Sequence, residues 1–428
     1  MYFAIFTLKK IKAICIVSFI ALSVSLMKIM FFLKQKEIFK IFEASNVSTF
    51  IFLSSANTRG IAKYSKNLNQ ELKHYSIIFP FFNYKNKILL FLREHIINFL
   101  IMTYIVLLKK IIFPQNTVNF IFPNSRLPLL SILFKCIKKI NLYIILHDAM
   151  EINTELKLNQ LILKFNSILI YTSILICDFI IYNSFSTKEN FNKLFLKTKN
   201  KKDFIYITIN KKLPYIDDFY SEIKFKKVNL YSICGITRNK NLDAYSDLLK
   251  YLNSNKYLVN YFLTGLDNQY LSNKTSLPVL KLQKNIFLNK KGGIKFSNAN
   301  YFSNSYIEDP LLYFLYLNTN YFVSLSLNEG FGIPVFEALR FGVNLILSDI
   351  SVYRELVEMF KNLGILKSKV KFVNLEDPYL CKNIINGISN EIISKNIKIQ
   401  RVKNYYQSGN IISNIYNSKL LNKLLEDE

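Results

Sequence analysis

Two glutamates and two glycines in the stretch NEGFGIPVFEAL, residues 328–339, have types and a spacing that suit ligand chemistry. Glu329 and Glu337 are separated by seven residues, and Gly330 and Gly332 lie between them. Glycine lets the backbone approach a ligand closely, and the free amides of a helix amino terminus favour an anion such as a diphosphate. Carboxylates repel phosphate but accept hydrogen bonds from the hydroxyl groups of a ribose or a sugar. The stretch therefore predicts a site for a ligand that carries both phosphate and hydroxyl groups.

The elements that position this stretch are predicted to be a strand, a loop, a helix and a second strand. Residues 321–326 and 344–348 are strand-length runs, so the helix between them is expected to be the crossover of a parallel unit. Pro334 suits the first turn of that helix, and Gly342 suits the residue just past its end. The glycine loop is thus expected at the carboxyl end of a strand, feeding a helix amino terminus.

Other residues with suitable chemistry follow two more predicted strands. Arg238 and Lys240 come after a strand at 228–234, where basic side chains suit a diphosphate leaving group, although solvated surface lysines are the alternative. His147 follows a strand at 142–146, and a side chain at that place opens into the crevice of an α/β sheet. Lone histidines are more often structural.

Further elements are expected on either side of these strands. The first strand is predicted at 48–54 and another at 177–182. Ser186, with Glu189 three residues later, predicts a capping box at the start of the next helix. Residues 210–224 have mixed charge and no clear periodicity, as a linker would.

Several of these motifs resemble those of a known family. The pattern E-G-F-G-x-P-x-x-E-A-L, followed by G-x-x-x-x-x-S-D, is similar to the donor-site motif of retaining GT-B glycosyltransferases, the glycogen-synthase-like and mannosyltransferase-like members of glycosyl transferases group 1. The stretch NTRGIAKYSKNL, which contains Arg59 and Gly60, resembles the glycine-containing first loop of that family. Residues 147–148, His-Asp, resemble a pair that the family places after the corresponding strand.

The resemblance implies an α/β GT-B fold, in which two doubly wound Rossmann-like domains face a central cleft. An amino-terminal apolar extension is expected at 1–45 and an acceptor-side domain at 46–215. A nucleotide-sugar-binding domain is expected at 216–400. A carboxyl-terminal helix, 401–428, would pack back on the first domain.

The resemblance also implies the reaction. A hexosyl group would move, with retention of configuration and without a cofactor, from a nucleoside diphosphate sugar to a hydroxyl of a glycan or lipid-linked acceptor. Glu329 and His147 would be catalytic and contact the donor sugar, while Glu337 would hold the ribose. The other donor-binding residues would be Arg59, Gly60, Arg238, Lys240, Gly330, Phe331 and Gly332. No D-x-D pair stands in a suitable loop, so no metal ligand is predicted.

Composition limits the competing functions. The chain has 428 residues, 51% of them hydrophobic, which is enough for two cores and argues against disorder. Its formal net charge of +27 is compatible with nucleic acid or an anionic membrane, but the lysines are dispersed and no nucleic-acid module is visible. A basic nucleic-acid-binding protein and a catalytically silent GT-B binding subunit are the two alternative functions.

The location of the protein depends on its first 45 residues. Residues 13–27 are uncharged and mostly apolar, and Lys28 then interrupts the run. A signal peptide, a spanning helix, an interfacial anchor and a mis-assigned start are the competing interpretations. Five scattered cysteines are typical of a reducing compartment. We expect a cytoplasmic protein attached to the inner face of an anionic membrane, acting in cell-surface glycan or polysaccharide synthesis.

Overall fold

The computed structural model describes most of the chain from residue 129 onward and less of the part before it. The described ranges are 48–52, 76–78, 117–122, 129–147, 170–194, 202–205, 228–235, 237–257, 259–281, 300–304, 307–389 and 393–417, with short pieces between 68 and 127 and at 168. Residues 1–45 lie outside these ranges, as do Arg59 and Gly60 of the expected first loop. The predictions made for them therefore stay predictions.

The chain divides into two compact units, each described by itself. The first unit runs to Ile144 and includes Ile176–Asp178, and the second comprises Ile145–Leu175 and Phe179–Asp427. The second unit thus contains both the glycine loop and the segment that follows residue 179. The boundaries expected from the sequence remain a separate prediction about domains.

A six-stranded sheet has the order β2-β1-β3-β4-β5-β6. Its strands are β1 (Ser48–Phe52), β2 (Ser76–Ile78), β3 (Thr117–Phe122), β4 (Ile140–Leu146), β5 (Phe179–Tyr182) and β6 (Lys202–Ile205). The registers resolved among them are all parallel. Buried runs such as TVNFIF in β3 and INLYIIL in β4 are typical of strands covered on both faces.

A seven-stranded sheet has the order β13-β12-β11-β7-β8-β10-β9. Its strands are β7 (Val228–Ile233), β8 (Val259–Thr264), β9 (Val279–Lys281), β10 (Asn300–Asn304), β11 (Tyr321–Ser324), β12 (Asn344–Ser348) and β13 (Val370–Val373). All resolved pairings are again parallel. The chain runs outward from β7 through β8 to the edge strand β9, steps back to β10 between β8 and β9, and then returns to β11 on the other side of β7. The winding direction therefore reverses between β7 and β11.

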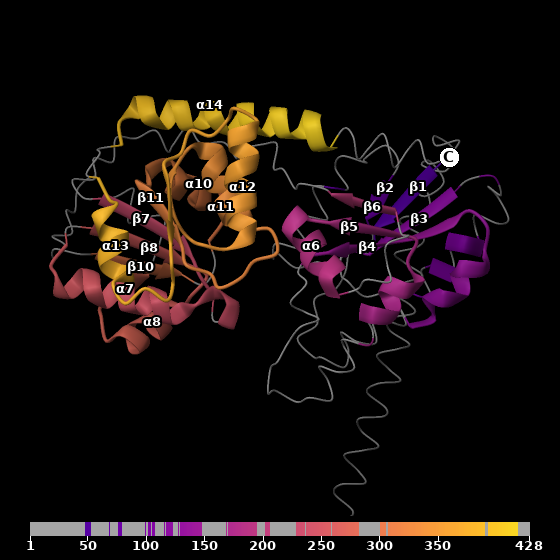
Figure 1. Cartoon of the computed structure of the whole chain (residues 1–428), viewed down its shortest axis with the longest axis horizontal. Helices are drawn as coiled ribbons and strands as arrows, with labels where there is room; N and C mark the ends of the chain where they lie inside the picture. The colour runs from indigo at the N-terminus through magenta and orange to yellow at the C-terminus, as the bar shows by residue number, and fades with distance from the viewer. Residues whose placement is uncertain are drawn as a thin grey trace, which may run out of the picture. The chain divides into compact units, whose positions relative to one another are not determined.

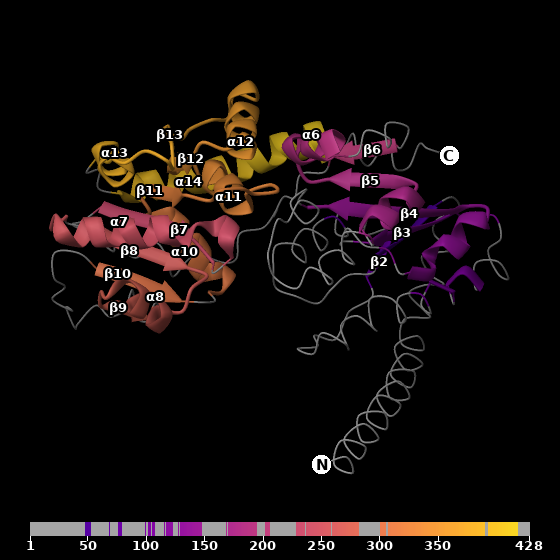
Figure 2. The same ribbon diagram turned by 60° about the horizontal axis from the view of Figure 1, so that its bottom comes forward.

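Helices cover both faces of this second sheet. They are α7 (Leu242–Ser254), α8 (Asn268–Thr275), α10 (Asp309–Asn318), α11 (Ile333–Phe341), α12 (Ser351–Asn362), α13 (Leu380–Asn386) and α14 (Lys395–Ile412). Figures 1 and 2 show α10, α11, α12 and α14 on one face, with α7, α8 and α13 on the other. Other helices include α6 (Phe185–Leu194), the 3-10 helices η2 (Leu129–Cys136) and η6 (Arg238–Lys240), and the π-helix η7 (Ser413–Asn417).

Each face of the seven-stranded sheet has its own hydrophobic core. The core under α10, α11 and α12 is rich in rings, and Tyr231 of β7 meets Tyr316 and Phe322 at centroid distances of 5.3 and 5.4 Å. The core under α7 and α13 is mostly aliphatic, with Leu248 and Leu252 completely buried. Two separately filled cores make the second sheet a rigid platform for the loops at its carboxyl edge.

The long helix α14 is attached to the platform by two buried arginines. Arg401 donates from Nη1 to the carbonyl oxygens of Tyr316, Leu317 and Thr319 at 2.8–3.0 Å, and so satisfies the last turn of α10. Arg340 of α11 lies 3.7 Å from the centroid of the Tyr405 ring and donates to the Tyr405 carbonyl at 3.0 Å. These contacts pack α14, which begins at residue 395, on α10 and α11. Residues 418–428 lie outside the described part of the chain.

Among the described residues, the predicted strands and helices agree with the structure within a few residues, with one error. The linker expected at 210–224 lies outside the described part. The strands expected at 321–326 and 344–348 are β11 and β12, and the crossover helix between them is α11, with Pro334 in its first turn and Gly342 at its end. The capping box expected at Ser186 is wrong, because α6 begins at Phe185. The Ser184 hydroxyl instead accepts a hydrogen bond from the Thr187 backbone N–H at 3.0 Å.

Candidate functional site

The site is formed by the loops that follow β7 and β11. These two strands are neighbours in the sheet, and they stand where the winding reverses. In open parallel sheets, ligands bind outside the carboxyl ends of the strands at such a reversal. The loop after β7 contains Arg238 and Lys240, and the loop after β11 contains Glu329. The topology therefore brings together two motifs that are about ninety residues apart in the sequence.

Backbone conformation explains the glycines and the proline around α11. Gly332 is the N-cap residue with a φ of 74°, and Gly342 is the C-cap residue with a φ of 70°. Both angles lie in the left-handed region that favours glycine. Helix α11 thus begins at Ile333 with its unpaired amides at the end of the glycine loop. These amides and the helix dipole form a place for an anion.

Glu329 and Lys240 meet directly at this place. The Lys240 ammonium forms an ion pair with Glu329 Oε1, and the side chains are 24% and 13% exposed. Ser326, two residues after the end of β11, donates its hydroxyl to the same carboxylate oxygen at 2.8 Å. An ammonium has three donors, so Lys240 retains capacity for a second anionic partner beside Glu329. The arrangement can hold a diphosphate next to a carboxylate that contacts hydroxyl groups.

Backbone hydrogen bonds hold the two loops in register. The Leu327 N–H donates to the Asn239 carbonyl at 2.8 Å, and Asn239 Nδ2 lies 3.5 Å from the Asn328 carbonyl. Ser348 at the end of β12 donates its hydroxyl to the Ser326 carbonyl at 2.6 Å. The serine of the S-D motif therefore supports the start of the glycine loop.

The backbone of His147 lies against Gly330, and the predicted role of the His147 side chain stays a prediction. A Cβ atom at Gly330 would collide with the backbone carbonyl oxygen of His147 and come within 2.8 Å of its carbonyl carbon. The same His147 oxygen accepts a hydrogen bond from Asn183 Nδ2 at 2.8 Å. Residues 147 and 183 belong to the same compact unit as the loop. Glycine is required at position 330 because another backbone approaches it closely.

Two hydroxyls of helix α6 hold the next peptide of the loop. Ser184 Oγ and Thr187 Oγ1 donate to the Gly330 carbonyl oxygen at 2.7 and 2.9 Å. In a trans peptide the carbonyl and the following N–H point in opposite directions. The Phe331 N–H is therefore directed away from α6, while the Phe331 ring is buried and lies 5.1 Å from the Phe336 ring. The backbone, and not the ring, is the part of Phe331 that suits a ligand.

Glu337 occupies a more enclosed place than Glu329. Its side chain is 4% exposed and lies in the ring-rich core, where it interacts with the Tyr316 hydroxyl. Burial, followed by the Glu337 charge, raises the pKa of Tyr316 well above its usual value. A ribose at this carboxylate would therefore share it with a protonated tyrosine. Whether Glu337 holds a ribose stays a prediction.

The remaining predicted residues divide into those on the surface and those outside the described part. Arg238 is exposed in η6, and Lys240 is half-buried beside it. Cys234, at the base of the same loop, is buried, and burial raises the pKa of its thiol to about 12, so it remains protonated. Arg59 and Gly60 are not among the described residues.

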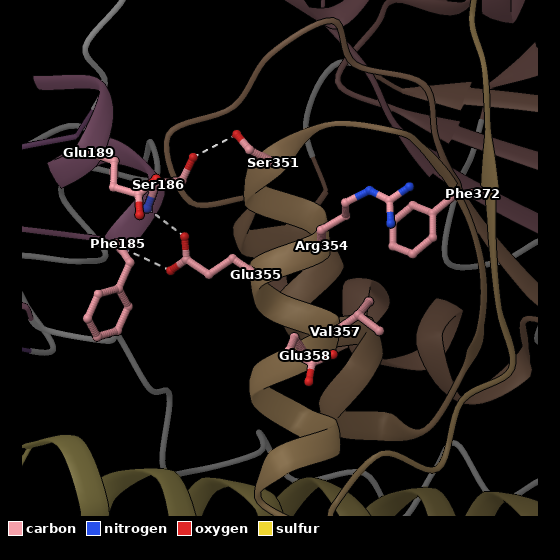
Figure 3. A pocket seen from close by; sticks show the side chains of 9 residues that line it. All are labelled: Phe185, Ser186, Glu189, Ser351, Arg354, Glu355, Val357, Glu358 and Phe372. Carbon is pink, nitrogen blue, oxygen red and sulfur yellow. Dashed lines mark hydrogen bonds between the residues drawn. The ribbon is translucent and has the colours of Figure 1, made fainter. Parts of the chain in front are cut away.

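A cavity of about 410 Å³ lies beside the site, between α6 and α12 (Figure 3). Glu355 of α12 accepts hydrogen bonds from the backbone N–H groups of Phe185 and Ser186 at 2.8 and 2.6 Å. The first two amides of α6 are thus capped by a carboxylate from another helix, while the Ser184 hydroxyl accepts from the third amide, that of Thr187. Burial raises the pKa of Glu355.

Metal ligands and membrane-spanning helices can be judged for the part of the chain that the structure describes. There, no group of three or more His, Cys, Asp or Glu side chains is arranged to hold a metal ion. None of the helices in the same part is long and apolar enough to cross a bilayer. Metal independence and membrane attachment both stay predictions.

Sequence reasoning missed several residues that shape the site. Ser326 was placed only in a strand, and Tyr353, Asn183, Ser184 and Thr187 were given no role. A β-branched or hydroxyl residue in a strand carries no local signal of the loop it contacts. The hydroxyl residues near Ser186 were the one available signal, but they were assigned to helix capping.

Known proteins resemble the chain in sequence and in fold. Residues 226–371 match the family described as Glycosyl transferases group 1, whereas no curated protein sequence matches the chain significantly. Sucrose-phosphate synthase from Thermosynechococcus elongatus has a TM-score of 0.59 at 13% identity, over 89% of this chain and 100% of that chain. A trehalose-6-phosphate synthase has a TM-score of 0.54 at 11% identity, over 89% of this chain and 99% of that chain. The catalytic domain of starch synthase IV from Arabidopsis thaliana has a TM-score of 0.50 at 9% identity, over 87% of this chain and 99% of that chain.

Proposed function

We propose that this chain, whose residues 226–371 belong to the Glycosyl transferases group 1 family and whose fold is GT-B, transfers a sugar from a nucleoside diphosphate sugar to an acceptor hydroxyl. The observation that carries the proposal is the meeting of Lys240 and Glu329 in front of helix α11. A cation, a carboxylate and a helix amino terminus at one winding reversal suit a ligand with phosphates next to hydroxyl groups.

Each group has a role in the proposed reaction. The bond between the anomeric carbon and the diphosphate oxygen breaks, the acceptor oxygen forms the new bond, and its proton leaves with the nucleoside diphosphate. Arg238, Lys240 and the amides of residues 330–332 stabilise the charge that develops on the diphosphate. Glu329 binds the sugar and stabilises the developing positive charge at its anomeric carbon. Retention of configuration is the outcome that the family resemblance supports.

The other side of the sugar and the nucleoside complete the site. His147 contacts the sugar, and the position of residue 147 against Gly330 supports this role. Glu337 accepts hydrogen bonds from the ribose, and Arg59 and Gly60 contact the donor phosphate and the acceptor. No metal ion is required, because Arg238 and Lys240 supply positive charge where the diphosphate leaves.

The cellular setting is a separate proposal. Nucleoside diphosphate sugars are made in the cytoplasm, and a net charge of +27 favours attachment to an anionic membrane surface. We place the protein on the inner face of the membrane, in the synthesis of a cell-surface glycan or polysaccharide. Fractionation of the full-length protein and of a form lacking residues 1–45, with a high-salt or carbonate wash, tests this. Retention of the full-length form after both washes would contradict a peripheral attachment.

Thermal unfolding with a panel of nucleotides tests the function itself. UDP, ADP, GDP and their hexose conjugates are added in turn, and the conjugate that raises the melting temperature most is used for turnover. A ligand at ~100 times its dissociation constant adds ~2.7 kcal/mol of stability. If no nucleotide changes the melting temperature while duplex DNA binds in a salt-dependent manner, the chain is a nucleic-acid-binding protein instead.

The basic pair is tested by charge removal with a matched control. Arg238→Ala combined with Lys240→Ala should lower kcat far more than it weakens binding of the nucleoside, because the charge is needed most as the diphosphate leaves. The control combines Lys250→Ala with Lys361→Ala, which removes the same charge from exposed ion pairs at 4.0 Å. Equal losses in both double variants, or loss of activity on chelation of metals, would contradict this role.

A further inference from the structure

Tyr353 lies beneath the site and contacts it in two ways. It is the third residue of α12, and its side chain is 1% exposed. Its hydroxyl lies 2.6 Å from Ser324 Oγ at the end of β11. Neither the family match nor the proposed reaction requires a tyrosine here.

The hydroxyl of Tyr353 belongs to the network that holds Glu329. Ser324, Ser326 and Glu329 all have side-chain hydrogen-bond interactions with it. Ser326 in turn donates to Glu329 Oε1 at 2.8 Å, the oxygen that also pairs with Lys240. Burial and the Glu329 charge raise the pKa of Tyr353, so its hydroxyl keeps its proton and acts as a donor near that carboxylate.

The ring of Tyr353 supports the other end of the same loop. A Cβ atom at Gly332 would lie 2.8 Å from Tyr353 Cε1 and 3.3 Å from its Cδ1. The ring therefore fills the space beside the N-cap residue of α11 and fits only a glycine there. One side chain thus contacts both the carboxylate at 329 and the turn at 332.

We infer that Tyr353 is a positioning residue that fixes the Glu329 carboxylate and the Gly332 turn relative to each other, an inference that rests on the proposed function. Its hydroxyl limits the rotation of Glu329, and its ring limits the movement of the turn whose amides face the diphosphate. The two groups that act on opposite ends of the bond to be broken are thereby held by one rigid side chain.

A hydroxyl deletion with a matched control isolates this role. Tyr353→Phe keeps the ring and removes only the oxygen. Tyr261→Phe is the control, because Tyr261 is also completely buried and its hydroxyl also lies close to a serine, Ser232 Oγ, at 2.7 Å. Tyr261 belongs to β8 and has no contact with the glycine loop among the described hydrogen bonds.

Hydrogen exchange gives a readout that does not depend on activity. Exchange in the full-length protein is followed by mass spectrometry on peptides that cover residues 326–333. Loss of one hydrogen bond corresponds to about 1 kcal/mol, so amides of this loop should exchange about five- to tenfold faster in Tyr353→Phe. They should be unchanged in Tyr261→Phe. Unchanged exchange in Tyr353→Phe, or the same acceleration in both variants, would overturn the inference.

Turnover gives the second readout, with the nucleotide sugar chosen from the thermal panel. In Tyr353→Phe, kcat should fall about tenfold while the donor KM changes less than about twofold, because the hydroxyl acts on the position of Glu329 and not on donor affinity. Faster exchange with an unchanged kcat would show that this position is irrelevant to the reaction and refute the role. If unsubstituted protein shows no turnover with any donor, the proposed function fails, and the exchange comparison alone decides whether Tyr353 holds the loop.

Discussion

Replacement of Gly330 by alanine should inactivate the enzyme without unfolding it. The added Cβ would collide with the backbone oxygen of His147 and lie 2.8 Å from the carbonyl carbon, where ordinary contact begins at 3.4 Å. The oxygen lies closer still than the carbon, so the loop must move by more than the 0.6 Å that separates 2.8 from 3.4 Å. Neither neighbour can yield easily, because the His147 oxygen is fixed by Asn183 and the Gly330 carbonyl by two hydroxyls.

The magnitude follows from this displacement. Overpacking costs about 1–3 kcal/mol, and a shift approaching 1 Å at reacting groups can lower the rate by about 100-fold. We expect kcat/KM for sugar transfer to fall by about 10- to 100-fold, with a melting temperature lowered by only a few degrees.

Gly387→Ala is the matched control. Its Cβ would meet Lys371 Cδ at 2.9 Å, but a lysine side chain can move aside, and the Gly387 φ of −91° suits alanine. Steady-state transfer and thermal unfolding are measured for both variants. Activity of Gly330→Ala within about twofold of the control would refute the close approach of residues 147 and 330.

Three further predictions concern binding, pH dependence and stability. Glu337→Ala should weaken binding of the free nucleoside diphosphate by about 1.5–3 kcal/mol, because buried ribose hydroxyls lose their acceptor. Calorimetry measures this affinity, and an unchanged value would remove Glu337 from the site. Because burial raises the pKa of Glu355 above its usual value, the folded state binds more protons than the unfolded state. This group's stabilisation is therefore present below the usual pKa of a glutamate and is lost as the pH rises through the raised value. Glu355→Gln should flatten the dependence of the free energy of unfolding on pH in this range, as measured by urea unfolding. The same pH dependence in the variant and the unsubstituted protein would contradict the assignment. Gly409→Ala should destabilise the fold by about 1–3 kcal/mol, because its Cβ would collide with the Arg340 guanidinium. Alanine is the better helix former, so a gain in stability would show that Arg340 can move.

Local signals were sufficient for the segment from Tyr321 to Ser348. Strand-length apolar runs, Pro334 and Gly342 predicted β11, α11 and β12, because proline and a left-handed glycine restrict the backbone whatever surrounds them. The family-like spacing of Glu329 and Glu337 could also be recognised in the sequence alone, since both lie within one loop and one helix.

Only the tertiary structure decided which distant groups meet. The pairing of β7 with β11 brings Lys240 to Glu329, and no sequence period encodes that neighbour relation. The start of α6 depends partly on such a contact, because Glu355 of α12 accepts from its first two amides. Tyr353 is an ordinary core tyrosine in the sequence, and it gains a role only because α12 places its hydroxyl beneath the glycine loop. Local backbone preferences are properties of a few adjacent residues, whereas these contacts exist only once the parallel sheet has brought the ends of non-adjacent segments to one edge.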